Sequence, residues 1–138
     1  MTPCLAHLLS VLRTSRDELV RRSTDVVYLT DNAPLPREDV EQLMRASIAI
    51  LEEGLAGETN EVRSGFLEAL PELAGATTLD DAIKGGLPTW GVIIGQLSVA
   101  VNEQYRDEAI MILSRFMGLW WSDVLKVMLP VYMAKGTL

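Results

Sequence analysis

Apolar residues recur every three or four positions along most of this chain, which is the spacing of one face of an α-helix. The pair Thr2–Pro3 is typical of a helix start. The first apolar stripe follows this pair and consists of Leu5, Leu8, Leu9 and Leu12. We find no alternation of apolar and polar residues of the kind that marks a strand. The pattern therefore predicts an all-α fold of about six to seven helices.

Capping and helix-breaking residues give the expected boundaries of these helices. Ser15 and Glu18 have the spacing of a capping box, and Thr78, which is followed by two aspartates, is expected to cap a short helix. Gly57 suits the left-handed position after a helix, and Pro71 is expected to end one. The segment 30–36 has the composition of a loop. We expect helices at about 3–12, 15–29, 36–56, 59–70, 78–86, 87–105 and 107–133.

Residues 85–102 carry no charged side chain, although 22% of the chain is charged. This stretch lies at the lower limit of membrane-span length and contains Pro88 and four glycines, so we do not expect it to cross a membrane. It is apolar on all sides, which is typical of a central buried helix. Gly91 and Gly95 share one face, and we expect them to let another helix backbone approach closely.

The last helix is predicted to have two apolar faces. One face comprises Ile110, Leu113, Met117, Trp120, Val124 and Met128. The other comprises Ile112, Phe116, Leu119, Trp121, Leu125 and Leu129. Since one face is enough to pack on the core of the chain, the second face predicts an interface with a partner.

Composition and charge narrow the function classes. The chain has 138 residues, of which 49% are hydrophobic, so we expect one folded domain spanning 1–138. Its net charge is −7, and acids far outnumber bases between residues 38 and 81. A nucleic-acid partner is therefore not expected, because binding phosphates needs clustered Lys and Arg.

The supply of reactive side chains is small. Cys4 is the single cysteine, which excludes an internal disulfide and fits a reducing cytoplasm, and we see no signal peptide. His7 is the single histidine and shares a helix face with Cys4. Two ligands do not make a zinc site, and nothing supports a catalytic triad with His7 as base. We therefore expect no metal, no cofactor and no enzymatic activity.

Four segments together resemble a known family over nearly the whole chain. They are SRDELVRRSTDVVYL, DVEQLMRASIAILEEGLAGE, IKGGLPTWGVIIGQLSVAVNEQY and ILSRFMGLWWSDVLKVMLPVY. Their order resembles the N-terminal sensor domain of the RsbR-type stressosome proteins, which are bacterial co-antagonists in the general stress pathway. The resemblance rests on helix patterns and not on a catalytic motif.

This resemblance implies a globin-like fold without haem that pairs into a homodimer. No histidine follows His7, so the proximal ligand of a haem globin is missing. In the family, the N-terminal and last helices form the dimer contact, and a STAS domain follows. Because this chain ends at Leu138, we expect either an excised N-terminal part or a protein that acts alone. The expected dimer interface comprises Leu5, Leu8, Leu9, Leu12, Trp120, Trp121, Leu125 and Met128.

The leading functional hypothesis is a non-catalytic, cytoplasmic sensor and dimerisation module of a stress-response signalling protein. In this hypothesis the last helix transmits a signal to other proteins of a stress-response complex. The alternative is a sensor globin that binds a small, fatty-acid-like apolar ligand. The pocket expected for it comprises Phe66, Leu67, Trp90, Ile93, Ile94, Leu97, Phe116 and Met117. A haem protein and an enzyme of unrecognised class are the remaining alternatives.

Overall fold

The computed structural model describes residues 1–30, 36–58 and 61–136. These residues form six α-helices and one short 3₁₀ helix, and they contain no strand, which confirms the all-α class. The helices are α1 (Pro3–Thr14), α2 (Arg16–Thr30), α3 (Arg37–Ala56), α4 (Glu61–Ala76), α5 (Leu79–Ala100), the 3₁₀ helix η1 (Glu103–Tyr105) and α6 (Arg106–Ala134).

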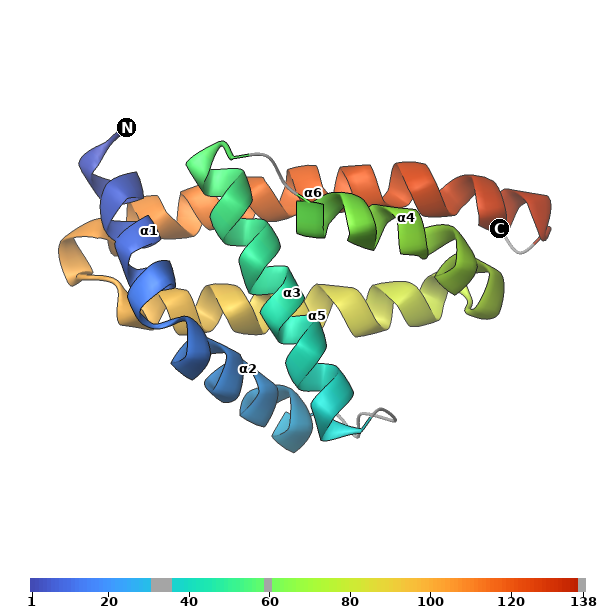
Figure 1. Ribbon diagram of the computed structural model, residues 1–138, viewed down its shortest axis with the longest axis horizontal. Helices are drawn as coiled ribbons and strands as arrows, with labels where there is room; N and C mark the ends of the chain where they lie inside the picture. Colours follow the sequence, from blue (N-terminus) through green and yellow to red (C-terminus); the bar gives the residue numbers. More distant parts are fainter. Residues whose placement is uncertain (31–35, 59–60, 137–138) are drawn as a thin grey trace.

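The long antiparallel pair of α5 and α6 runs the length of the molecule (Figure 1). The short helix η1 joins the two at one end, where α1 crosses them. Helix α3 crosses the pair on the near side of the view, α4 lies along α6, and α2 packs between α3 and α5. The other four helices thus pack against the α5–α6 pair. Because α6 runs the length of the molecule, its two ends lie at opposite ends of the molecule.

Three of the expected caps are confirmed. The hydroxyl of Thr2 accepts a hydrogen bond from the N–H of Leu5 at 3.2 Å, and Thr78 likewise accepts one from Asp81 at 3.1 Å. Gly57 follows α3 with φ of 70°, in the left-handed conformation that glycine adopts most readily. These bonds satisfy backbone groups that have no partner inside their own helix.

Three expected boundaries are wrong. Helix α4 continues through Pro71 to Ala76, and α5 is one helix through the pair at 85–86 instead of two. Helix α5 also ends at Ala100, five residues before the expected Tyr105. A proline or glycine costs a helix a few kcal/mol at most, about 3 and 1 respectively, and packing along a long neighbour such as α6 outweighs this. The expected start at Thr59 and most of the loop at 30–36 lie outside the described residues.

Buried side chains from all six α-helices form one hydrophobic core. The apolar stripe of α1 contributes Leu8 and Leu12, both completely buried, and α5 contributes Ile93 and Leu97. Helix α5 is nevertheless not buried on all sides, which corrects the expectation for 85–102. It packs mainly against α2 and α6, and its remaining side faces solvent.

Two glycines allow close helix contacts, but they are not the expected two. A Cβ atom at Gly54 would overlap the ring of Phe116, and a Cβ at Gly86 would lie 2.5 Å from ring carbons of Trp121. A Cβ at Gly91 or Gly95 would have no atom within 4 Å from outside its own helix backbone and chain neighbours. The close approach of helices therefore occurs at α3–α6 and α5–α6, and the face of Gly91 and Gly95 is open.

We expect Gly54→Ala to lower the free energy of unfolding by up to about 2 kcal/mol, measured by urea denaturation. The new methyl group displaces Phe116, which costs about 1–3 kcal/mol, and the gain in helix propensity offsets about 1 kcal/mol of this. The matched control is Gly65→Ala in α4, where a Cβ meets no atom within 4 Å. We expect the control to stabilise the chain by about 0.5–1 kcal/mol. Equal effects of the two changes would contradict the contact.

Candidate interaction surface

Helix α5 has one exposed face along most of its length. The exposed positions recur at helical spacing and are Lys84, Pro88, Gly91, Gly95 and Val99. The side chain of Val99 is 72% exposed. This face therefore shows small and apolar groups to solvent, between two sides that are covered by α2 and α6.

Helix α6 has a similar exposed face in its first half. The exposed positions at helical spacing are Glu108, Met111, Arg115, Gly118, Leu119 and Ser122, and Asp107, Ile110 and Ser114 are exposed beside them. Met111 is 73% exposed and Leu119 is 61% exposed. On the opposite side of the same segment, Leu113 and Trp120 are buried in the core. One side of this helix is thus buried and the other is exposed, but most of the exposed side is uncharged as well.

The two exposed faces belong to neighbouring helices that pack against each other. Helix α5 packs against α2 and, less extensively, α1, whereas α6 packs against α4, α1 and α3, and the two helices cover each other along the pair (Figure 1). The exposed positions of α5 and α6 are the sides that these contacts leave uncovered. We call this surface the outer face, and it consists of Pro88, Gly91, Gly95, Val99, Met111, Arg115, Gly118, Leu119 and Ser122.

The outer face carries almost no charge. The chain has 19 acidic residues, yet none lies between 82 and 102 or between 109 and 122. Arg115 is the one charged side chain on the face, and it forms no salt bridge to any residue within 1–30, 36–58 and 61–136. An exposed apolar patch of this kind on a globular domain marks an interaction site more often than free solvent-facing surface.

The residues of the expected dimer interface lie largely inside a single chain. Five of its residues are buried within a single chain: Leu8, Leu9, Leu12, Trp120 and Met128. The other three, Leu5, Trp121 and Leu125, are half-buried. Helix α1 packs against α3 and α6 of its own chain, so its leucine stripe already has a partner. Likewise, Phe116 and Trp121 of the second apolar face of α6 pack on the core, so that face is only partly open.

The residues of the expected apolar pocket lie in or against the core. Trp90, Ile93 and Leu97 are buried, and the other five are half-buried and pack on the core. The rings of Trp90 and Phe116 lie 5.8 Å apart, and those of Phe66 and Trp120 lie 5.6 Å apart, each pair tilted. Of the eight residues, Trp90 and Phe116 are in ring contact with each other, whereas Phe66 packs on Trp120, which is not one of the eight.

A surface hollow of about 610 Å³ lies elsewhere, between α1 and the end of α3. It contains none of the expected pocket residues. Its lining consists of Met1, Ala6, Leu9, Ser10, Arg13, Thr14, Ala56 and Glu58. Arg13 and Glu58 form a salt bridge at its edge, and both side chains are at least half exposed. The hollow is mixed in polarity and open, unlike a pocket for an acyl chain.

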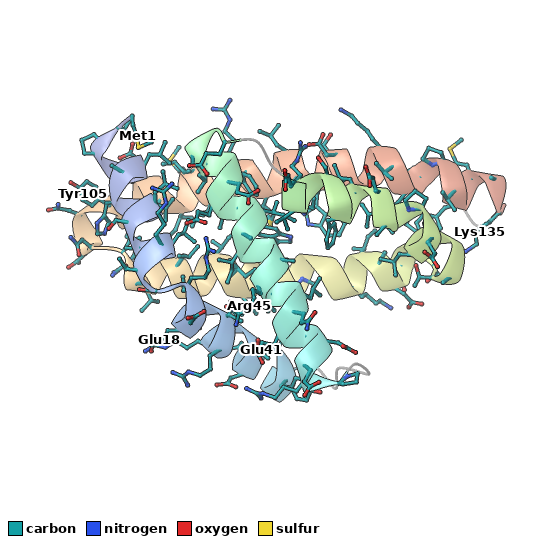
Figure 2. All side chains as sticks on the ribbon, in the orientation of Figure 1. Met1, Glu18, Glu41, Arg45, Tyr105 and Lys135 are labelled. Carbon is teal, nitrogen blue, oxygen red and sulfur yellow. The ribbon has the colours of Figure 1, made fainter. Side chains whose placement is uncertain are left out.

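The single cysteine and the single histidine tie α1 to the turn between α5 and α6. The thiol of Cys4 donates to the carbonyl of Tyr105 at 3.6 Å, and Nε2 of His7 accepts the N–H of Asn102 at 3.0 Å. The rings of His7 and Tyr105 lie 5.1 Å apart. Figure 2 shows Tyr105 at this end of the molecule, beside α1. These contacts hold the turn in place. Cys4 therefore has the contacts of a residue that stabilises the fold.

We expect Cys4 to react slowly with Ellman's reagent in the folded chain at pH 8, and rapidly in guanidinium chloride. Burial raises the pKa of the Cys4 thiol, and the nearby Glu108 carboxylate raises this pKa further. Because the thiol ionises more readily in the unfolded chain, its own contribution to stability is fully present below about pH 8.5 and is lost as the pH rises above that value. The variant Cys4→Ala should lack this fall, and equal reactivity in both states would contradict the burial.

The end of α6 is attached to the corner between α4 and α5. Nζ of Lys135 donates to the carbonyls of Ala74, Gly75 and Thr77 at 2.9–3.1 Å. The hydroxyl of the buried Tyr132 lies 3.0 Å from the hydroxyl of Thr77. Figure 2 shows Lys135 at the end of the molecule opposite to Tyr105. These bonds fix the last turn of α6 to the α4–α5 corner.

The sequence pattern does not identify Val99 and Met111, the most exposed apolar side chains of the outer face. The sequence does indicate part of this face. Pro88, Gly91, Gly95 and Val99 fall on one side of the helix, and none of the first three has a large side chain. The glycine spacing on that face predicts the close approach of another helix backbone, and no helix among the described residues makes such an approach there. The pattern shows that the face is unusual, but it does not say what covers it.

No group of three or more His, Cys, Asp or Glu side chains suited to a metal is found among the described residues. Within the same residues, no helix is both long enough and apolar enough to cross a membrane. No family model, curated protein or solved structure matches the chain.

Proposed function

We propose that this chain is a non-catalytic sensor and dimerisation module of a bacterial stress-response signalling protein, similar to the sensor domain of the RsbR-type stressosome proteins. It acts in the cytoplasm, where its partners are a second copy of itself and other signalling proteins of a stress-response complex. The observation that carries the proposal is the uncharged, exposed face of the α5–α6 pair, where Val99, Met111 and Leu119 are each more than half exposed. A face of this kind supports association and not catalysis.

The position of α6 supports a role in transmission. It spans the molecule, and its first turns contact α1 and η1 while its last turns are bonded to the corner between α4 and α5. A shift of either end alters a single continuous helix. Coupling between the two ends requires two arrangements of α6 of similar free energy, with each signal favouring one of them.

Native mass spectrometry of the freshly purified chain at micromolar concentration tests this proposal. We expect the mass of a dimer without an added small molecule. A monomer over the whole micromolar range would overturn the dimerisation module. A dimer that carries an additional mass, which is lost on denaturation, would favour the fatty-acid-like sensor over a module that responds to protein partners.

A further inference from the structure

We propose that the hollow between α1 and the end of α3 binds a small monocarboxylate with a compact apolar body, and that the guanidinium of Arg13 holds its carboxylate. This inference goes beyond the proposed function and does not rest on dimerisation. The volume of the hollow, about 610 Å³, lies within the roughly 300–1,000 Å³ of small-molecule sites. The site is separate from the apolar pocket expected from the sequence, because none of those residues lines it.

Two arginines beside the hollow share one buried carboxylate. The Glu52 side chain is 11% exposed, its Oε1 lies 3.3 Å from Nε of Arg13, and its Oε2 pairs with Arg16. The two guanidinium groups carry two positive charges and Glu52 carries one negative charge, so the cluster has one positive charge in excess. Because Glu52 occupies the Nε edge of Arg13, the terminal amino groups of this guanidinium remain for a second anion.

Glu58 meets this excess charge only weakly. Its Oε1 lies 3.4 Å from Nη2 of Arg13, and its side chain is 60% exposed. The N–H of Glu58 donates to the carbonyl of Glu53 at 3.1 Å, which fixes the backbone after Gly57 but does not restrain the side chain. An exposed ion pair of this kind contributes little to stability. Glu58 thus occupies the place of a ligand carboxylate, and a ligand can displace it.

The charge and the lining of the hollow select the class of anion. Displacement of Glu58 leaves one positive charge to be met, which a monocarboxylate does with two parallel hydrogen bonds to the planar guanidinium. A phosphate dianion would exceed this charge, and the net charge of −7 of the chain repels it further. An apolar body has partners as well, since the lining includes Met1, Ala6, Leu9 and Ala56.

Nuclear magnetic resonance titration of the ¹⁵N-labelled chain with sodium benzoate tests this site. Benzoate joins one carboxylate to a compact apolar ring, and benzamide is its neutral control. We expect saturable shifts of the amide signals of Ala6, Leu9, Ser10 and Arg13, with a dissociation constant on the order of 1 mM for a ligand of so few atoms. At equal ionic strength, benzamide and inorganic phosphate should each bind at least about 10-fold more weakly.

Three variants separate the roles of the charged groups. Glu58→Gln removes the competing charge, and we expect it to tighten benzoate binding at least about 3-fold. Arg13→Met keeps an unbranched side chain without the guanidinium, and we expect it to weaken binding at least about 10-fold. The control Arg22→Met removes a similarly exposed arginine, which pairs with Glu18 and does not line the hollow, and it should leave binding unchanged. Circular dichroism checks the helical content of each variant.

Several outcomes would overturn the site. Equal affinities for benzoate and benzamide would exclude a role for the charge of Arg13, and tighter binding of phosphate would exclude the monocarboxylate class. An unchanged dissociation constant in Glu58→Gln would exclude displacement of Glu58, and this result stands even if Arg13→Met does not fold. A monomeric chain that binds benzoate as expected would overturn the dimerisation module and leave this site intact.

Discussion

Trp120→Ala is expected to lower the free energy of unfolding by about 3–5 kcal/mol, a larger loss than we expect for any other substitution of this chain named above or below. Trp120 is 4% exposed and its ring packs against Phe66 at a centroid distance of 5.6 Å. The guanidinium of Arg63 lies 5.7 Å from the centre of the same ring. Truncation removes this packing and leaves a cavity between α4 and α6.

Urea denaturation at several protein concentrations checks this prediction. If Trp120 belongs to the core of one chain, its loss destabilises the chain at every concentration. If it lies between two copies instead, the loss disappears as the protein is diluted and the wild type dissociates. Leu73→Ala in α4 is the control, because Leu73 is 47% exposed and its removal should change the stability by no more than about 0.5 kcal/mol.

Glu52→Ala is expected to lower the free energy of unfolding by about 2 kcal/mol. The Glu52 side chain is only 11% exposed, and it pairs with Arg13 at 3.3 Å and with Arg16. These two arginines lie at the junction of α1 and α2, so the carboxylate holds that junction against α3. Removing one partner of a fully buried pair costs about 3–5 kcal/mol, but both arginines are partly exposed and regain water, which reduces the loss.

The neighbouring Glu53 provides the control for this prediction. Its oxygen Oε2 is buried and has no hydrogen-bond partner among the described residues, and no salt bridge to Glu53 is found there. Thermal denaturation should therefore show little change or a small gain for Glu53→Ala. The variant Glu52→Gln keeps an acceptor for one arginine, and we expect a smaller loss than for alanine. Equal stabilities of the Glu52→Ala and Glu53→Ala chains would contradict the role of the ion pair.

The sequence was sufficient to predict the helices and much of the core. The stripe that contains Leu8 and Leu12 is buried as its spacing requires, and Val40, Met44 and Ile48 of α3 are buried in the same way. The caps at Thr2 and Thr78 were predictable because they depend on one side chain and the backbone of the next turn. Such features are local, so the residues within about one turn decide them.

The continuation of α4 through Pro71 and of α5 through residues 85–86 was not predictable from such local features. Pro71 and the glycine pair at 85–86 have the same local effect whether or not a long helix runs beside them. In the structure, α6 lies along both α4 and α5, and the packing that each of them gains outweighs the local cost. The contact of Trp121 with Gly86 shows that a glycine expected to end a helix instead makes room for a neighbour.

The sequence alone determines three features of the chain. These are its helical character, the apolar residues on more than one face of α5 and α6, and the absence of acids from much of both helices. Which of these apolar faces stays open follows only from the packing of the six helices. Helical periodicity sets the side of each helix on which a residue lies, but the neighbours of that side come from segments far apart in the chain. For this reason Trp120 and Leu9 are core residues, whereas Val99 and Met111 lie on the surface.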